Sequence, residues 1–295
     1  SLYVDKGYTP VYVRFVFILL ITSTLIEALL MSYFLRCLPW LLFVTSVTHA
    51  STEALETQHA DLERFQVIAH RGASGDAPES TLPALQLAYH AGADYLELDI
   101  QISADGHLVA FHDRELQRTS NGEGRINDYD LEALQQLDTG RWFNAASPDK
   151  ADGSFAGLPI LTLEEVFEHF GHDARYYLET KAPGQNPGLE PALINMLERF
   201  EMVQSGRVIV QSFSRESLLT MRDLNADLPL VQLLWLSADD APLNLEALGD
   251  IAEYSLGIGV NFRDNEQAVL TENFIQTAQH HGLKVHVYTV NEQKD

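Results

Sequence analysis

The fold is inferred first from residues 95–103, which read YLELDIQIS. Side chains of a β-strand alternate between two faces, so Glu97 and Asp99 share one face of this predicted strand and the leucine and isoleucine side chains share the other. In a barrel the apolar face would pack on helices, and both carboxylates would therefore point inward. The competing interpretation is a half-exposed strand whose acidic face is solvated.

On both sides of this stretch, apolar strand-like runs alternate with amphipathic helical runs, the pattern of an α/β fold. The predicted strands are residues 66–70, 95–103, 108–112, 176–181, 208–213, 230–235, 257–262 and 284–291. The predicted helices are residues 81–91, 128–137, 162–170, 189–200, 214–224, 243–252 and 271–281. The length left after any leader suits one domain of barrel size or two small ones.

Two regions depart from a simple strand–helix repeat. The link between predicted strands 95–103 and 108–112 is too short for a helical crossover, so one barrel unit lacks its helix or one strand is a hairpin outside the ring. Residues 140–159 are polar and contain Gly and Pro, and they are predicted to form a loop within an insertion. The chain stops four residues after predicted strand 284–291, so we expect the barrel to lack its last elements here.

The composition limits the partners. The chain has 42 Asp and Glu against 19 Lys and Arg, a formal net charge of −23. A surface this acidic repels nucleic acid and anionic lipid headgroups, so neither is an expected partner. The single cysteine, Cys37, excludes an intrachain disulfide and a cysteine metal cluster.

Residues 1–50 form a predicted leader. A short positive segment begins at Met31, residues 37–47 are apolar, and Thr48-His49-Ala50 matches a small-x-Ala cleavage site. This order of segments is typical of a secretory signal peptide. We therefore expect a mature N-terminus at Ser51 and a periplasmic or secreted protein.

The alternative for the leader is a membrane anchor over residues 11–30. This run is about as long as a membrane span requires, but Arg14 and Glu27 lie inside it and count against that interpretation. The polar residues 51–65 are a predicted linker, and residues 66–295 are the predicted folded domain.

The predicted strand 66–70 ends in His70, with Arg71 and Gly72 directly after it. Barrel enzymes place catalytic groups at the carboxyl ends of their strands. A histidine transfers protons near neutral pH, an arginine presents a fork of donors that fits phosphate, and a glycine permits close approach of the backbone to a ligand. The alternative is a structural histidine beside a surface arginine.

Glu97 and Asp99 are candidate metal ligands. Two buried anions this close repel one another, and one of them would take up a proton. A hard divalent cation removes the conflict, because Mg²⁺ and Ca²⁺ prefer carboxylate oxygens.

Two more predicted strands carry polar groups of the same kind. His112 ends the predicted strand 108–112, and the adjacent Asp113 is a candidate to orient its imidazole. Glu179 and Lys181 share one face of a later strand, where the first can complete a three-carboxylate site and the second can neutralise a phosphate oxygen. A metal, cations and two imidazoles together suit phosphoryl chemistry on a diester.

Taken in order, these motifs resemble those of the glycerophosphodiester phosphodiesterase family. The resemblance covers roughly residues 66–291 and rests on His70-Arg71-Gly72, Pro78-Glu79-Ser80-Thr81, Glu97-Leu98-Asp99, Asp105-Gly106, His112-Asp113, Glu179-Thr180-Lys181, Ser212-Phe213 and Tyr288-Thr289-Val290-Asn291. It implies a TIM-like (β/α)8 barrel of the phosphatidylinositol-phospholipase-C type. It also implies hydrolysis of a small glycerophosphodiester to glycerol 3-phosphate and an alcohol.

The resemblance also implies the site residues. His70 and His112 match the acid–base pair, with the nucleophile either water or the glycerol 2-hydroxyl. The implied ligands of one Mg²⁺ or Ca²⁺ are Glu97, Asp99 and Glu179, and the implied substrate contacts are Arg71 and Lys181. Ser80 stands where asparagine is commoner in the family.

Two other functions remain as alternatives. A lysophospholipase D acting on lipid diesters would have an apolar groove or amphipathic helix beside the site, and a membrane role is expected only if the leader is an anchor. A noncatalytic phosphodiester-binding protein would have lost a histidine or a carboxylate, and all of them are present.

Overall fold

The computed structural model describes residues 65–238, 246–265 and 267–290. These residues belong to the second of the two units into which the chain divides, Leu55–Asp295. The predicted leader lies outside the described residues, as does all of the predicted linker except Phe65. Within the described part of the chain, no helix combines the length and the apolar character needed to cross a bilayer.

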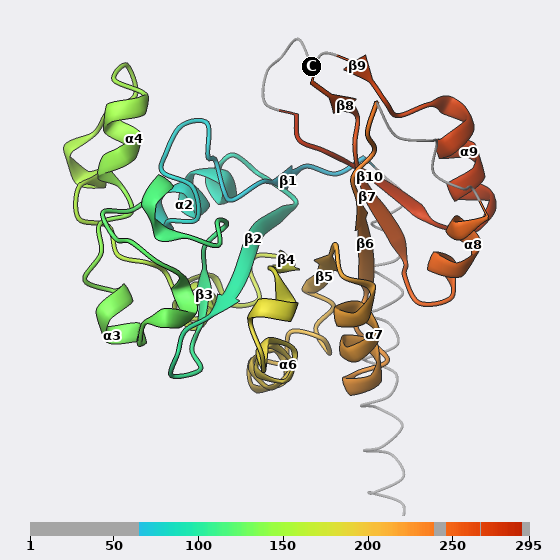
Figure 1. Cartoon of the computed structure of the whole chain (residues 1–295), viewed down its shortest axis with the longest axis horizontal. Coiled ribbons are helices and arrows are strands. Elements are labelled where there is room, and N and C mark those ends of the chain that lie inside the picture. The colour runs from blue at the N-terminus through green and yellow to red at the C-terminus, as the bar shows by residue number, and fades with distance from the viewer. Residues whose placement is uncertain (1–64, 239–245, 266, 291–295) are drawn as a thin grey trace, which may run out of the picture. The chain divides into compact units, whose positions relative to one another are not determined.

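Parallel strands form a curled sheet in the order β1, β2, β4, β5, β6, β7 and β10 (Figure 1). Their bounds are Ile68–Ala69, Tyr95–Ile102, Tyr176–Thr180, Val208–Ser212, Leu230–Leu234, Gly257–Asn261 and Lys284–Tyr288. In the described residues, no ladder joins β1 to β10 at the two ends of this order. The sheet is therefore an open half-barrel, which confirms the predicted (β/α)8 class.

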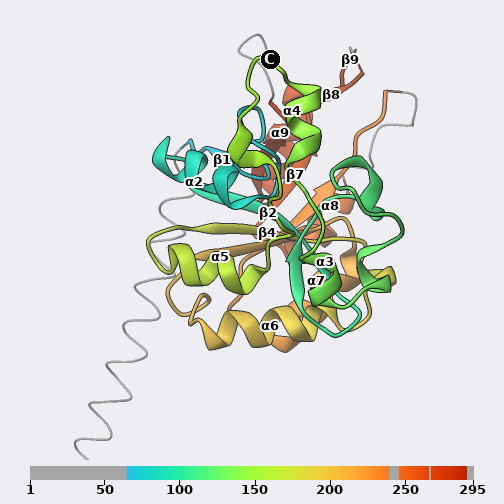
Figure 2. The ribbon, with the colours of Figure 1, turned by 90° about the vertical axis from the view of Figure 1, so that its left-hand side faces the viewer.

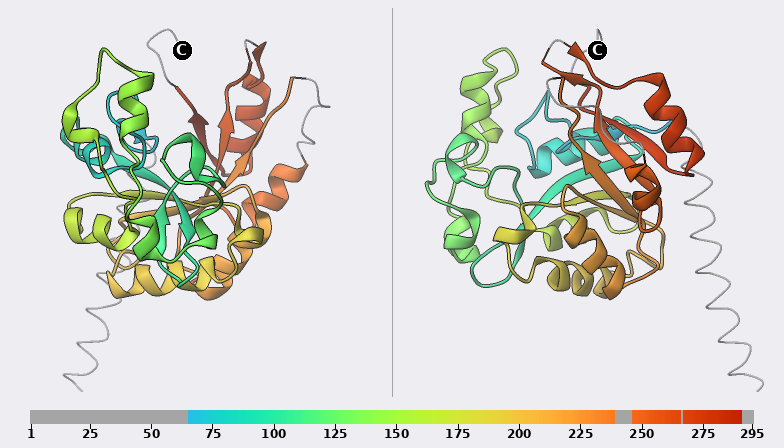
Figure 3. Two further views of the ribbon diagram at one scale, coloured as in Figure 1. Left: turned by 60° about the vertical axis from the view of Figure 1, so that its left-hand side comes forward. Right: turned by 45° about the vertical axis from the view of Figure 1, so that its right-hand side comes forward.

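Helices cover the outer face of the sheet, where Leu96, Leu98 and Ile100 join a large apolar core. Figure 2 shows α5 and α6 on one side of β2 and β4, and Figure 3 shows α8 and α9 outside β7 and β10. The helices are α2 (Leu82–His90), α5 (Leu163–Phe170), α6 (Leu189–Arg199), α7 (Arg215–Leu224), α8 (Ala247–Ala252) and α9 (Glu272–His280). A capping box between Thr162 and Glu165 begins α5 and shows why the helix starts there.

Strand β3 (Leu108–Ala110) answers the question that the short link left open. It pairs antiparallel with β2, with Ile100 opposite Ala110 and Ile102 opposite Leu108, and it lies off the parallel order of the sheet. The predicted strand is thus a hairpin arm outside the ring, and no helical crossover is needed.

The predictions for residues 128–159 were partly wrong. The helix expected over residues 128–137 is only α3 (Leu131–Leu134), and the expected loop over residues 140–159 contains α4 (Arg141–Ala146) and a 3-10 turn, η3. The reason is apolar packing, because Phe143 of α4 and Phe155 of η3 bury themselves against Ala77 and Ala84. Remaining short elements are η1 (Leu116–Arg118), η2 (Ile126–Asp128), η3 (Gly153–Phe155), η4 (Pro183–Gln185), β8 (Arg263–Asp264) and β9 (Gln267–Ala268).

The inner face of the sheet is apolar and aromatic at one end and polar at the other. Tyr95, Tyr177, Ile209 and Val231 form a buried cluster at the amino-terminal ends of their strands. Further along β2 and β4, the inward positions hold acidic side chains. The predicted alternation is confirmed, and the carboxylates point into the half-barrel.

Candidate active site

Three acidic side chains meet on the inner face of β2 and β4. Asp99 and Glu179 are register partners on the two neighbouring strands, and Glu97 lies two residues before Asp99 on the same face. One carboxylate oxygen from each residue lies within 4.8 Å of the others. All three residues are buried, with 3%, 0% and 7% of the surface of Glu97, Asp99 and Glu179 exposed.

Two cations lie against Asp99. Lys181 Nζ is 3.2 Å from Asp99 Oδ1 and 2.9 Å from Glu179 Oε1, and Arg71 Nε is 3.1 Å from Asp99 Oδ2. Within the described residues, neither oxygen of Asp99 forms a hydrogen bond of good geometry. A buried carboxylate with this much unused acceptor capacity fits a cation ligand, and the all-oxygen donor set fits Mg²⁺ or Ca²⁺.

The pKa values show how the chain tolerates this cluster. Burial, with the charges of Asp99 and Glu179, raises the pKa of Glu97 well above its ordinary value. Burial, with the charge of Asp99, raises the pKa of Glu179 to about 7. Burial acts in the same direction on Asp99, but Lys181 and Arg71 outweigh it and lower the pKa of Asp99. One firmly ionised carboxylate therefore lies between two that hold protons readily.

Arg71 sits on a strained turn after β1. Arg71 and Gly72 have φ of 58° and 81°, in the left-handed region that favours glycine. A Cβ on Gly72 would lie 2.6 Å from the backbone carbon of Ala84 in α2, so only glycine fits there. This turn directs the Arg71 N–H to Glu97 Oε2 at 2.7 Å.

His70 directly follows β1, which ends at Ala69, and directly precedes this turn. Its backbone carbonyl accepts a hydrogen bond from Ser74 Oγ at 2.8 Å. Burial, with the charge of Arg71, lowers the pKa of His70 to about 4, so the imidazole is neutral at neutral pH.

His112 reaches the site by a route that differs from the prediction. It was expected to end a strand equivalent to that of His70, but β3 runs antiparallel and ends at Ala110. The hairpin turns back along β2, and the Phe111 N–H donates to the Asp99 carbonyl at 2.9 Å. His112 is thereby returned to the level of the carboxylates.

The imidazole of His112 is oriented by its neighbour. His112 Nδ1 lies 2.6 Å from Asp113 Oδ1, which confirms that adjacent residues meet here. Burial lowers the pKa of His112, whereas Arg118 and His112 lower the pKa of Asp113 to about 2 against the effect of burial. Asp113 is thus an ionised acceptor, suited to a proton on Nδ1 that leaves Nε2 for a substrate.

Three residues of this region were not assigned a role from sequence. Glu79 belongs to the Pro78-Glu79-Ser80-Thr81 motif, but that motif does not predict the ion pairs of Glu79 with Arg71 and Arg118. Arg118 lies in the three-residue 3-10 turn η1, which is too short to show a repeating pattern of side chains in the sequence. Gln211 on β5 donates to Glu97 Oε1 at 3.3 Å, and its only signal was an inward strand position beside Glu179.

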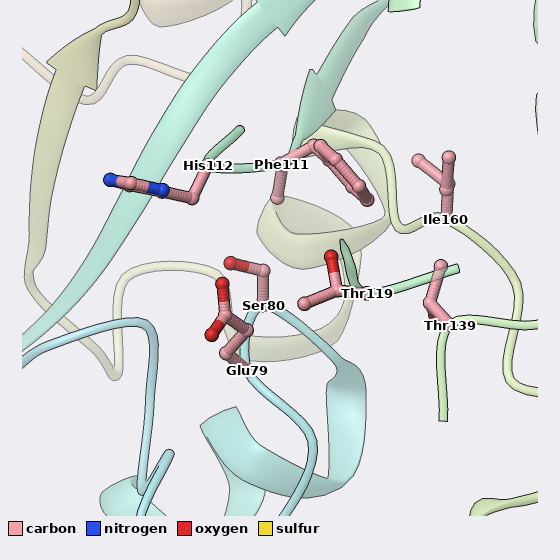
Figure 4. Close-up of a pocket in the computed structure, with 8 residues that line it drawn as sticks. Glu79, Ser80, Phe111, His112, Thr119, Thr139 and Ile160 are labelled. Carbon is pink, nitrogen blue, oxygen red and sulfur yellow. The ribbon is translucent and has the colours of Figure 1, made fainter. Parts of the chain in front are cut away.

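A small cavity lies next to His112 and has room for about one water molecule. Its lining includes Glu79, Ser80, Phe111, Thr119 and Thr139. Figure 4 shows Phe111 directed to one side of the backbone and the His112 ring to the other, away from Ile160. The cavity is therefore behind the imidazole, and it is too small to hold a diester.

Comparison with known proteins gives the class to which this fold and site belong. Residues 70–295 match the model of the glycerophosphoryl diester phosphodiesterase family. The chain belongs to this family, and the expectation of an enzyme of this class is confirmed.

Individual relatives agree with the family match. The glycerophosphodiester phosphodiesterase of Bacillus subtilis (strain 168) is 41% identical over 237 residues, which cover 79% of each chain. An Oleispira antarctica phosphodiesterase, solved in complex with the product sn-glycerol-3-phosphate, matches at 27% identity with a TM-score of 0.64 and covers 78% of this chain and 86% of its own. A glycerophosphodiester phosphodiesterase from Agrobacterium tumefaciens matches at 26% identity and a TM-score of 0.60, covering 78% and 89%.

Proposed function

We propose that this chain hydrolyses small glycerophosphodiesters to glycerol 3-phosphate and an alcohol, with one Mg²⁺ or Ca²⁺ and two histidines. The observation that carries the proposal is the trio of buried carboxylates, which offers one oxygen each within 4.8 Å. The unused acceptor capacity of Asp99 supports a cation there. The family match supports the diester substrate.

Glu97, Asp99 and Glu179 would hold the cation. When bound, a divalent cation supplies positive charge that polarises a phosphate and stabilises the charge that develops on its oxygens. Arg71 and Lys181 lie against Asp99 and are the chain's own donors for the remaining phosphate oxygens. Arg71 can offer its fork to two oxygens, whereas Lys181 acts as a point charge.

Proton transfer belongs to the two imidazoles. One histidine accepts the proton of the attacking hydroxyl as its oxygen forms a bond to phosphorus. The other histidine, in its protonated form, gives a proton to the alcohol oxygen as the bond between that oxygen and phosphorus breaks. The contact between His112 and Asp113 supports this role, because it leaves one ring nitrogen of His112 for the reacting atoms.

The test is the release of glycerol 3-phosphate from glycerophosphocholine. The protein is first treated with a chelator, and Mg²⁺ or Ca²⁺ is then restored. We expect the chelated protein to be inactive and one of the two ions to restore release. A folded, metal-loaded protein that released nothing from glycerophosphocholine, glycerophosphoethanolamine or glycerophosphoglycerol would overturn the proposal.

We also propose that the enzyme acts outside the cytoplasmic membrane, in the periplasm or after secretion. The support is the predicted signal peptide that begins at Met31 and ends at Ala50. N-terminal sequencing of the protein exported by its host should begin at Ser51. Residues retained from before Ser51 would contradict the predicted cleavage.

A further inference from the structure

One guanidinium joins the loop after β1 to the loop after β3. Arg118 donates from Nε to Asp113 Oδ2 at 2.5 Å and from Nη2 to Asp113 Oδ1 at 2.9 Å. It also donates from Nη1 to Glu79 Oε2 at 3.0 Å and from Nη2 to Glu79 Oε1 at 2.6 Å. Four bonds from one planar group hold two carboxylates in a fixed relative orientation, which a lysine cannot do.

The contacts of Arg118 with Asp113 and Glu79 form a clamp between the two loops. On one side of this clamp, Asp113 contacts His112. Gln101 Nε2 donates to the backbone carbonyls of Phe111 and Asp113, at 2.8 and 2.7 Å, and so anchors the backbone on both sides of the histidine. The ring itself is held by Asp113, at 2.6 Å from Nδ1. The direction of the imidazole therefore depends on how firmly the Asp113 carboxylate is held.

On the other side of the clamp, Glu79 contacts Arg71, which lies against Asp99 of the carboxylate cluster. Glu79 Oε1 accepts a hydrogen bond from Arg71 Nη1 at 3.1 Å, and Arg71 Nε lies 3.1 Å from Asp99 Oδ2. Among the described residues, Arg118, whose side chain remains 44% exposed, forms no hydrogen bond or ion pair with Glu97, Asp99 or Glu179. It therefore acts on the site through Asp113 and Glu79 only.

We infer that Arg118 is a positioning residue that holds His112 in its working orientation through Asp113, while Glu79 fixes the guanidinium of Arg118 from the other side. This inference rests on the proposed function, because it requires His112 to act in proton transfer. The competing view is that Arg118 merely ties two surface loops together. The two views differ in whether Arg118→Met still lowers kcat when His112 has already been replaced by alanine.

The first measurement compares Arg118→Met with Arg114→Met, using the full chain with saturating metal and glycerophosphocholine. Arg114 is an exposed arginine in the same loop, so its replacement removes the same charge. We expect Arg118→Met to lower kcat by about 10–100-fold, as outer partners of reacting groups do, with KM changed by less than about threefold. Arg114→Met should keep wild-type constants. A wild-type kcat in folded Arg118→Met overturns the inference.

The second measurement is a double-mutant cycle with His112→Ala. If Arg118 acts through His112, adding Arg118→Met to His112→Ala should lower kcat by less than about threefold, because the group being positioned is already absent. If the two losses multiply, Arg118 acts independently of His112 and the inference is wrong. A His112→Ala variant that kept its full rate would instead refute the proposed role of His112.

A folding defect can be separated from both outcomes. Thermal denaturation is recorded for each variant, and the cycle is repeated with Arg118→Lys, which keeps the charge but not the fork. We expect Arg118→Lys to be as stable as the wild-type protein and still about tenfold slower, or more. Full activity of Arg118→Lys would show that only a charge is needed there and would exclude positioning by the fork.

Discussion

The backbone N–H of Phe111 lies 2.9 Å from the backbone carbonyl oxygen of Asp99 and donates a hydrogen bond to it. This bond joins the returning arm of a hairpin to the strand that carries two of the three carboxylates. Because β3 turns back along β2, His112 lies beside the inner carboxylates rather than beyond the rim of the sheet. The hairpin is thus the element that brings a second imidazole to the cluster.

Removal of either imidazole should slow the reaction strongly. We expect His70→Ala and His112→Ala each to reduce kcat by roughly 10²–10⁴-fold, the usual contribution of a positioned acid or base. Steady-state release of glycerol 3-phosphate measures this, and His280→Ala on the exposed face of α9 is the control. Near-normal rates in both folded variants would remove the two histidines from the mechanism.

Loss of charge at Asp99 should weaken metal binding. Asp99 is fully buried and is the carboxylate whose pKa is lowered, against the effect of burial, by Lys181 and Arg71. We expect Asp99→Asn to raise the Kd for the metal by at least about tenfold, which is about 1.4 kcal/mol. Calorimetric titration of metal into the chelated protein gives the value, and the exposed Asp223→Asn should bind as the wild-type protein does. An unchanged titration of Asp99→Asn would exclude Asp99 as a ligand.

Metal binding should weaken as the pH falls through neutrality. The pKa of Glu179 is raised to about 7 by burial and by Asp99, so the metal-free protein holds a proton there below that pH. A cation needs the ionised carboxylate and must displace this proton. We expect Kd to rise at least about tenfold between pH 8 and pH 6, because Glu179 gives up one proton over this range and Glu97, whose pKa is also raised, adds to the effect. Titrations in two buffers of different ionisation enthalpy count the proton released. Equal Kd values at both pH values would contradict the raised pKa.

Much of the carboxylate site could be predicted because strands repeat with a period of two. That period alone places Glu97 and Asp99 on the face opposite Leu98, and the structure confirms it. The motif order then indicated the family. The same reasoning located Lys181 and Glu179 together, because they too are separated by one residue of a strand.

The remaining features depend on contacts between segments that no local pattern specifies. A short link between two strands cannot tell a hairpin from a missing helix, so the direction of β3 was open. Arg118 lies in a loop where neither spacing nor composition marks a partner, and its carboxylates are 5 and 39 residues away. The helix α4 was missed because polar and Gly residues around it hide the two phenylalanines, Phe143 and Phe155, that bury it.

A half-buried histidine on β10 should make stability depend on pH. His286 on β10 contacts Tyr177 Oη through Nδ1, and burial lowers the pKa of His286 to about 4. A lowered histidine pKa means that the unfolded chain binds the proton first. The stabilising effect is full above about pH 6.5 and is lost as the pH falls toward 4, by at most about 3 kcal/mol.

Urea unfolding at about pH 7 and about pH 4.5 tests this effect. Between these conditions, His286→Gln should lose less free energy of unfolding than the wild-type protein does. The exposed His280→Gln is the matched control and should follow the wild-type curve. If His286→Gln and the wild-type protein lost the same free energy, His286 would not be the source of the acid sensitivity.

The turn that holds Arg71 should tolerate no side chain at Gly72. Gly72 and Gly92 share a left-handed backbone, with φ of 81° and 82°, but only the Cβ of Gly72 would collide, at 2.6 Å from the backbone of Ala84. Gly92→Ala should therefore lower the free energy of unfolding by only about 1–2 kcal/mol, the cost of holding a residue with a Cβ in the left-handed conformation. Gly72→Ala should cost at least about 1 kcal/mol more, because the backbone must shift to relieve the overlap.

The shift should also reach the chemistry. The Arg71 N–H that donates to Glu97 Oε2 at 2.7 Å is one residue from Gly72, so a displaced turn moves both that donor and the guanidinium. We expect Gly72→Ala to lose kcat/KM at a temperature where it is still fully folded, while Gly92→Ala keeps the wild-type value. Urea unfolding and initial rates on the two variants measure the two effects separately. Equal stability and equal kcat/KM in the pair would show that the close approach of the turn to α2 has no part in forming the site.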